Sequence, residues 1–233
     1  MTSPATETQG VATPELLTLL LADARLPVAG HTQSNTLEGA VLAGLGAADV
    51  ATFVRARLLG VTRVEAGTAG AARAGVVHGW GVRPVERAWA ARTASPALRE
   101  ASRVQARTLR RLAGSLWPAS VVPLAPEAGG VARPARAVVL GAVAAHLGLD
   151  AAQTARIVAY DDVQTVCAAA LKLLPLDPLE VTGWVADALP GVAAVVDAVV
   201  DVELPGDVPA LAAPQIEVWA QAHARTTRRL FRA

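Results

Sequence analysis

Apolar residues recur at three- and four-residue spacing along most of the chain, in segments separated by Pro, Gly and short polar stretches. Within residues 49–74, for example, Phe53, Val54 and Leu58 recur at helical spacing, while arginines occupy other faces. Most segments open with Pro or Asp and several close at Gly, as helices do. No alternating strand pattern with hairpin turn residues is visible. The chain is therefore predicted to be all-α, a single compact, bundle-like domain of about ten helices.

The same punctuation sets the expected helix boundaries. We expect helices over the following ranges: 14–24, 34–42, 49–74, 84–92, 96–114, 134–148, 150–174, two within 178–200, and 214–229. Residues 75–84 and 114–134 are rich in Gly and Pro and are expected to be loops. Residues 1–13 are expected to form a mobile N-terminal leader, 14–224 the all-α domain and 225–233 a basic C-terminal tail.

Composition narrows the class of protein. The 233 residues are 53% hydrophobic but only 3% aromatic, so small aliphatic side chains must fill a large core. A net charge of +1 gives no field that would steer the chain onto nucleic acid or anionic lipid. The single cysteine, Cys167, excludes an internal disulfide and fits a reducing, cytoplasmic compartment. No uncharged apolar run reaches the roughly 20 residues of a bilayer span, so no membrane segment is expected.

One helix carries a basic face. Arg103, Arg107 and Arg110 are spaced to lie on the same side of the helix that Pro96 opens. The overall charge is nevertheless balanced, and no helix-turn-helix spacing is apparent. A solvated face or an acidic protein partner is therefore favoured over nucleic acid.

Catalytic motifs are missing from the sequence. There is no phosphate-binding glycine loop, and the four scattered histidines lie far from Cys167, so no zinc-type spacing exists. Asp161 and Asp162 are adjacent and point about 100° apart on a helix, a poor geometry for an acid/base dyad. We interpret them as solvated or partner-facing carboxylates. His31 and Ser34 are too close in sequence to form a triad, so a binding or assembly role is favoured over catalysis.

The polar stretch in LPVAGHTQSNTLEGAV separates two apolar segments. Ser34 is the predicted N-cap of the helix that follows, with Asn35 as the alternative and Glu38 as a capping-box acid. A cap needs only one or two polar residues, so the stretch holds more than capping requires. We therefore predict that His31 and Gln33, together with Ser34 and Glu38, form a partner-binding patch.

Lys172 is the only lysine among 21 basic residues. It falls near the end of a predicted helix, where a cation interacts favourably with the helix dipole, but arginine would serve that role equally well. A compact ammonium differs from a guanidinium in the contacts it makes. Lys172 is therefore predicted to contact a partner, and its interaction with the helix end stays open as the alternative.

The last nine residues combine basic and apolar side chains. The predicted partner-binding residues of this tail are Arg225, Arg228, Arg229, Leu230, Phe231 and Arg232. Such a tail is expected to order on the surface of a partner. The alternative is that Leu230 and Phe231 pack back onto the protein's own helices.

Several motifs together resemble the UreF family of urease accessory proteins. LPVAGHTQSNTLEGAV, VCAAALKLLPLDP and the C-terminal HARTTRRLFRA are each similar to a family signature and occur in the family's order. Between them, REASRVQARTLRRLA and VVLGAVAAHLGLD are similar to two further family helices. The resemblance covers the chain from Pro14 to Ala233.

The resemblance implies an all-α homodimer without enzymatic turnover. Members of the family bridge the accessory protein UreD, also called UreH, and the nickel-carrying GTPase UreG. The assembly delivers nickel to apo-urease, so nickel is expected as a transient cargo and no stably bound cofactor is expected. His31, His223 and Cys167 are the soft side chains available, but no residue is assigned as a nickel ligand.

The chain departs from the family signatures at several positions, which makes it a divergent member. The residues that differ are His31, Gln33, Thr36, Ala106, Asp177, Pro178 and Ala233. Thr36 and Ala106 each stand where the family has glycine, and Asp177 and Pro178 replace a Gly-Gln pair. A rival interpretation is an all-α enzyme or small-ligand-binding domain with its pocket at the loop of residues 30–36.

Overall fold

The computed structural model describes residues 13–23, 26, 33–227 and 230–231, and all regular elements within them are helices. Ten α-helices are present there: α1 (Pro14–Leu21), α2 (Leu37–Leu42), α3 (Val50–Leu59), α4 (Val61–Val77), α5 (Arg83–Arg92), α6 (Pro96–Leu116), α7 (Arg136–His146), α8 (Ala151–Leu173), α9 (Pro178–Val199) and α10 (Pro214–Ala224). Four short 3-10 helices join them: η2 (Ala47–Asp49), η3 (Pro118–Leu124), η4 (Pro126–Ala128) and η5 (Pro205–Asp207). The predicted all-α class is confirmed.

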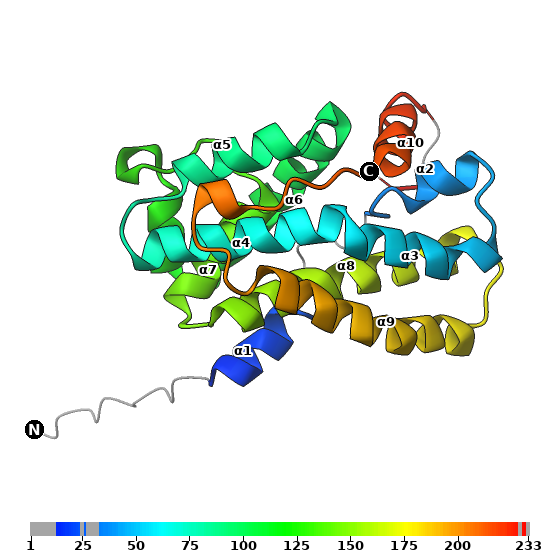
Figure 1. Ribbon diagram of the computed structural model, residues 1–233, viewed down its shortest axis with the longest axis horizontal. Coiled ribbons are helices and arrows are strands. Elements are labelled where there is room, and N and C mark those ends of the chain that lie inside the picture. The colour runs from blue at the N-terminus through cyan, green and yellow to red at the C-terminus, as the bar shows by residue number, and fades with distance from the viewer. Residues whose placement is uncertain (1–12, 24–25, 27–32, 228–229, 232–233) are drawn as a thin grey trace, which may run out of the picture.

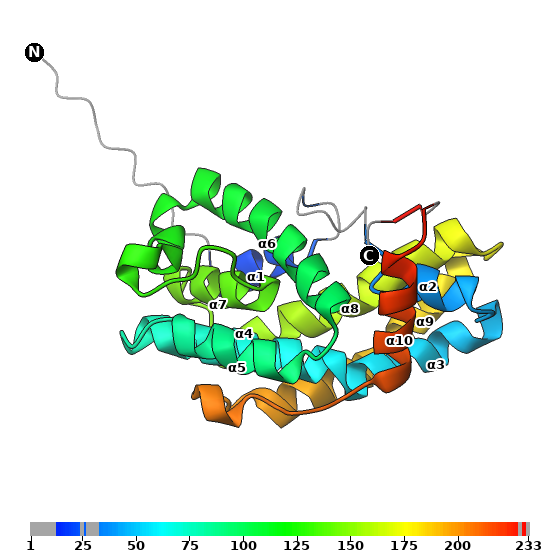
Figure 2. The ribbon, with the colours of Figure 1, turned by 90° about the horizontal axis from the view of Figure 1, so that it is seen from above.

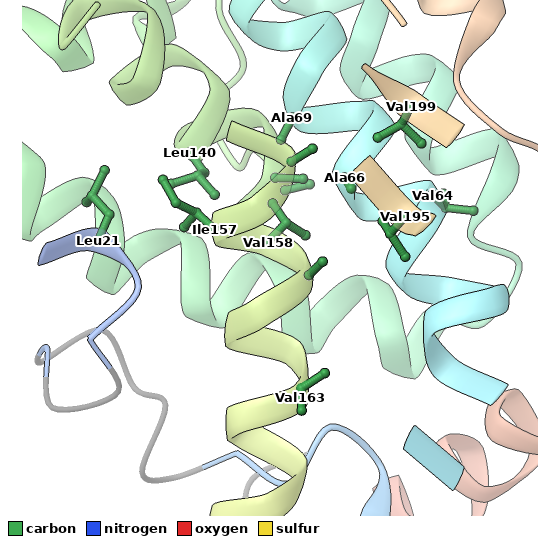
Figure 3. Close-up of a cluster of buried hydrophobic side chains, with 14 of the residues drawn as sticks. Leu21, Val64, Ala66, Ala69, Leu140, Ile157, Val158, Val163, Val195 and Val199 are labelled. Carbon is green, nitrogen blue, oxygen red and sulfur yellow. The ribbon is translucent and has the colours of Figure 1, made fainter. Parts of the chain in front are cut away.

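The apolar α4 lies at the centre, with α7, α8, α9 and α5 packed around it (Figure 1). Small residues on α4 let these neighbours approach closely. At Gly141 of α7, for example, a Cβ atom would overlap the carbonyl oxygen of Ala69. Figure 3 shows part of the resulting core, in which Ala66 of α4 lies near Val195 of α9, and Leu140 of α7 lies near Ile157 of α8. An Ala- and Val-rich sequence therefore builds its core from close backbone approach rather than from aromatic rings.

Local capping explains several helix starts. Asp150 begins α8 with a capping box, in which its carboxylate accepts the Gln153 amide at 2.6 Å and Gln153 Oε1 accepts the Asp150 amide at 2.9 Å. Asp177 caps α9 by accepting the Leu179 amide at 2.8 Å. Pro178 occupies the first position of α9, where its missing N–H is no loss. The departure from the family at residues 177 and 178 thus supplies a strong helix start.

Besides shifts of a few residues at the ends of α1, α2 and α10, three parts of the helix pattern differ from expectation. One helix, α9, spans the region where we expected two, because Pro190 is exposed and the carbonyl that it leaves unbonded can be hydrated. The expected helix over 49–74 is divided at Gly60, whose φ of −121° and ψ of −96° are not helical. The expected loop over 114–134 contains the end of α6 and the 3-10 helices η3 and η4, and η3 packs against α6 and α7.

By length and composition alone, α9 is long and apolar enough to cross a bilayer. Its 18-residue apolar stretch has a mean hydropathy of 1.4, and 28% of that stretch is buried in the protein. One such helix is weak evidence, because a core helix of a soluble protein passes the same test. In this chain α9 packs along α8, α3 and α4. Asp187 and Asp197 also lie within it, and carboxylates are costly inside a bilayer.

The C-terminal helix closes one end of the bundle. α10 crosses the ends of α2 and α6, as the view from above shows (Figure 2). The approach to α2 is close, since a Cβ atom at Gly39 would lie 2.7 Å from the carbonyl oxygen of Trp219. This crossing brings residues from both ends of the sequence to the same place.

Candidate functional site

A buried carboxylate in α2 organises the C-terminus. Glu38 is 5% exposed, and its Oε2 lies 2.9 Å from His223 Nε2 of α10. The backbone amides of Leu230 and Phe231 donate to Glu38 Oε1 and Oε2 at 2.6 Å and 2.8 Å. Because α2, α10 and the chain after it share this carboxylate, Glu38 fixes the path of the tail.

Phe231 and Lys172 complete this arrangement, which we call the Glu38 latch (Glu38, Lys172, His223, Leu230 and Phe231). The Phe231 side chain is 3% exposed, and the Lys172 ammonium lies 5.4 Å from the centre of its ring. Leu230 is bound through its amide but leaves its side chain 64% exposed. In this structure Phe231 therefore packs onto the protein's own helices, which was the alternative to ordering on a partner.

The predicted N-cap behaves differently from expectation. The Ser34 hydroxyl accepts the Glu38 amide at 3.2 Å, so it does satisfy a first-turn donor, but α2 begins at Leu37 with Thr36 as its N-cap residue. The capping-box role of Glu38 is wrong, because its carboxylate binds the tail. Asn35 and Thr36 have φ values of +47° and +74°, a left-handed turn that places Ser34 beneath the helix.

The seven predicted partner-binding residues that the structure describes divide into a buried group and an exposed group. Ser34, Glu38 and Phe231 are buried by intramolecular contacts, and Gln33 is 2% exposed. Lys172, Arg225 and Leu230 are exposed and lie on or beside the latch. The remaining four, which are His31, Arg228, Arg229 and Arg232, lie outside the described residues. A partner that binds this conformation would contact the exposed group. The assignment of all eleven residues to partner binding stays a prediction.

A second cluster surrounds Asp162 of α8. Arg57 donates to it from Nε at 3.0 Å and from Nη2 at 2.6 Å, Thr62 donates at 2.6 Å, and Asn35 Nδ2 donates at 2.6 Å. Arg57 also donates from Nη1 to the Asn35 carbonyl at 2.9 Å. The side chains of Arg57 and Asp162 are only 6% and 12% exposed. The interpretation of Asp162 as a solvated or partner-facing carboxylate is wrong, since α3, α4 and α8 enclose it.

Asp161 and Glu65 extend this charge cluster. Asp161 pairs with Arg136 of α7 at 2.9 Å, and both side chains are less than a fifth exposed, so it too is not solvated. Burial raises the pKa of the Asp161 carboxyl, which the nearby Arg136 partly offsets. Glu65 of α4 accepts the Trp89 indole N–H at 2.6 Å, and burial raises the pKa of this carboxyl as well.

These charges line a cavity of about 510 Å³. Its walls come from the turn before α2 and from α3, α4, α6, α7, α8 and α10. Gln33 lines it, and neither its amide nitrogen nor its amide oxygen has a hydrogen-bond partner among the described residues. The rival interpretation placed a pocket at residues 30–36, and of that range the described residues Gln33, Asn35 and Thr36 do line this cavity.

This charge cluster was hard to predict from the amino-acid sequence. Arg57 and Asp162 lie 105 residues apart, and each lies among the buried residues of its helix. A charged residue on an apolar helix face is the only signal that would have pointed to them. Cys167 lies nearby and is buried, and burial raises the pKa of its thiol to about 11, which keeps it protonated. Among the described residues, no group of three or more His, Cys, Asp or Glu side chains is arranged to hold a metal ion.

Comparison with known proteins gives a consistent result. The sequence profile of the UreF family matches residues 45–189. Urease accessory protein UreF of Mycobacterium sp. (strain JLS) is 38% identical over 221 residues, which cover 93% of this chain and 98% of that protein. The proteins of the same name from Mycobacterium bovis (strain BCG / Pasteur 1173P2) and Mycobacterium tuberculosis (strain ATCC 25618 / H37Rv) are 40% and 39% identical over 167 residues, covering 70% of this chain and 75% of each.

Proposed function

Because the chain belongs to the UreF family of urease accessory proteins, we propose that it acts as a scaffold in urease maturation. In this role it bridges UreD, also called UreH, and the GTPase UreG, so that nickel reaches apo-urease. The family is one of accessory proteins rather than enzymes, and the chain is not an enzyme. The observation that carries the proposal is the likeness to a urease accessory protein along 93% of the chain.

The Glu38 latch supports a docking role for the C-terminus. It holds the tail against α2 and α10, so that Leu230 is an exposed apolar group and Lys172, over the ring of the next residue, Phe231, is an exposed cation. Arg225, at the end of α10, adds a second exposed cation. A surface that combines apolar and basic groups on a fixed backbone suits a protein partner with an acidic, partly apolar face.

The proposal includes features that follow from the family role. The protein works in the cytoplasm as a homodimer, and nickel passes through the complex as cargo without a stably bound cofactor in this chain. The enzyme half of the rival interpretation does not fit a family of accessory proteins. The ligand-binding half has a specific observation in its favour, which is the charged cavity that Gln33 lines.

Co-purification tests the proposal directly. The full chain, tagged, should retain UreD and UreG from cells that express all three, and it should raise urease activity in cells that lack their own UreF. Tagged chain carrying Arg156→Ala, an exposed arginine of α8, serves as a matched control and should behave as the unchanged protein. If neither partner is retained and urease activity does not rise, the scaffold role is wrong.

A further inference from the structure

The charges that line the cavity do not balance. Asp162 is paired with Arg57 and Asp161 with Arg136. Glu65 has no ion pair among the described residues, since its carboxylate accepts a hydrogen bond from the neutral indole of Trp89. The cavity lining holds four carboxylates and two guanidinium groups, and the fourth carboxylate, Glu100, pairs with Arg133 outside the lining. Glu65 is thus the one lining carboxylate without a direct counter-charge among the described residues.

A buried carboxylate without a counter-charge is unfavourable. Burial is the main reason that the pKa of Glu65 is raised, and the two arginines, which act at a distance, offset this only in part. Glu65 is half-buried and lines the cavity, so a molecule in the cavity can reach it. A cation placed there would remove the imbalance.

The side-chain amide of Gln33 is a second reason to expect a ligand in this cavity. Its side chain is 2% exposed, and both polar atoms of the amide lack a hydrogen-bond partner within the part of the chain that the structure describes. Leaving a buried donor or acceptor unpaired costs about 1–3 kcal/mol each, so native proteins rarely do so. Water in the cavity could satisfy this amide but would not supply a positive charge.

The wall that α6 contributes is partly apolar. It carries Ala97, Leu98, Ala101 and Val104 as well as the polar residues Glu100, Ser102 and Gln105. A volume of about 510 Å³ falls in the range of about 300–1,000 Å³ that is typical of small-molecule sites. The lining therefore matches a molecule with a cationic N–H donor head and a short alkyl chain.

We propose that this cavity binds an alkylguanidinium or alkylammonium group, with Glu65 and Gln33 as acceptors for its N–H donors and the α6 residues against its alkyl chain. The group could belong to a free solute or to an arginine or lysine side chain of another protein. The chemistry is the same in both cases, and the experiment separates them. The inference does not rest on the proposed scaffold role, because it concerns the isolated chain.

Calorimetric titration of the full chain with n-butylguanidinium tests the proposal. We expect saturable binding at one site, and binding at least tenfold weaker for n-butylurea, which has the same shape but no charge. An acetylated, amidated peptide with a central arginine forms the second arm: tighter binding of the peptide identifies a protein side chain as the natural occupant, and tighter binding of n-butylguanidinium identifies a solute. Absence of binding by all three, or equal binding of the charged and uncharged probes, would overturn the proposal.

Two variants locate the site. Glu65→Gln removes the charge but keeps an oxygen that can accept the Trp89 N–H, and should weaken n-butylguanidinium binding at least tenfold. Gln33→Leu replaces an unpaired amide by an apolar group, so it should fold and still bind more weakly. Glu203→Gln, on an exposed residue outside the cavity, is the matched control and should bind as the unchanged chain does. Full affinity in folded Glu65→Gln and Gln33→Leu proteins would show that the cation binds elsewhere.

Discussion

The carboxylate of Glu38 and the imidazole of His223 lie 2.9 Å apart at a site where their side chains are only 7% and 2% exposed. They are 185 residues apart in sequence, so this contact closes the fold by joining its second helix to its last. The same carboxylate accepts two backbone amides of the tail. A single acidic side chain thus decides both how α10 docks and where the chain runs after it.

Replacing Glu38 should therefore release the tail. Glu38→Ala leaves His223 and the amides of Leu230 and Phe231 without their acceptor, and we expect the free energy of unfolding to fall by about 3 kcal/mol. Urea denaturation measures the loss, and limited proteolysis should cleave the chain after α10 faster than in the unchanged protein. Glu127→Ala, on an exposed residue of η4, is the control. Equal stability and equal proteolysis would show that the latch does not hold the tail.

Breaking the Arg57–Asp162 pair should be costly, because Asp162→Asn leaves a buried guanidinium without its counter-charge. We expect a loss of about 3–5 kcal/mol, measured by urea denaturation. The double change Arg57→Met and Asp162→Leu should recover much of this loss, since it removes both charges together. The matched control is Glu100→Gln, which breaks the ion pair between Glu100 and Arg133. Both of these side chains are more than half exposed. That change should cost no more than about 1 kcal/mol.

Thr36 adopts a backbone conformation that suits glycine. Its φ of +74° is strained for a β-branched residue. Thr36→Gly should raise the free energy of unfolding by about 1 kcal/mol, and Gly148→Ala, at a φ of +71° with open space around it, should lower it by about 1 kcal/mol. Thermal unfolding of both variants checks the pair. A loss of stability in Thr36→Gly would mean that the buried Thr36 side chain contributes more than the strain costs.

The sequence predicted those parts of the fold that depend on neighbouring residues. The starts of α1, α6 and α8 were predicted from Pro14, Pro96 and Asp150, because proline at a first turn and an aspartate cap act within a few residues. The continuation of α9 through Pro190 was not predicted, since packing against α8 outweighs a local helix-breaking residue. Local signals therefore set helix starts, while tertiary contacts decided whether a helix continued.

The candidate sites were harder to predict for the same reason. Glu38 was singled out, but its actual partners come from residues more than 180 positions away, which a helix-capping pattern cannot reveal. Asp162 was judged by its neighbour Asp161 and by helix geometry alone. Its real environment is set by Arg57 and Thr62, about 100 residues earlier, on two other helices. The chemistry of a buried charge depends on contacts that no local spacing encodes.

The raised pKa of Glu65 gives stability a definite pH dependence. Because its pKa is higher in the folded chain than its ordinary value of 4.5, the folded state holds this proton more tightly than the unfolded state does. As pH rises from about 4.5 through the raised folded pKa, Glu65 should therefore lower the free energy of unfolding. Glu65→Gln cannot ionise, so its stability relative to the unchanged protein should grow across this window and level off above it. Urea denaturation at a series of pH values checks this, and a constant difference would show that Glu65 is not perturbed.

Lys172 offers a test that separates its intramolecular contact from partner binding. Its ammonium lies over the Phe231 ring, an interaction worth about 0.5–1 kcal/mol at an exposed site, so Lys172→Ala should lower stability only slightly. Lys172→Arg keeps a cation there but changes its shape and hydrogen-bonding geometry. If the ammonium contacts a partner, both variants should reduce urease activation several-fold in cells that supply UreD, UreG and apo-urease, with helicity and oligomeric state unchanged. If Lys172 acts only through Phe231, Lys172→Arg should activate urease normally, and unchanged activation by both variants would remove Lys172 from the partner-binding surface.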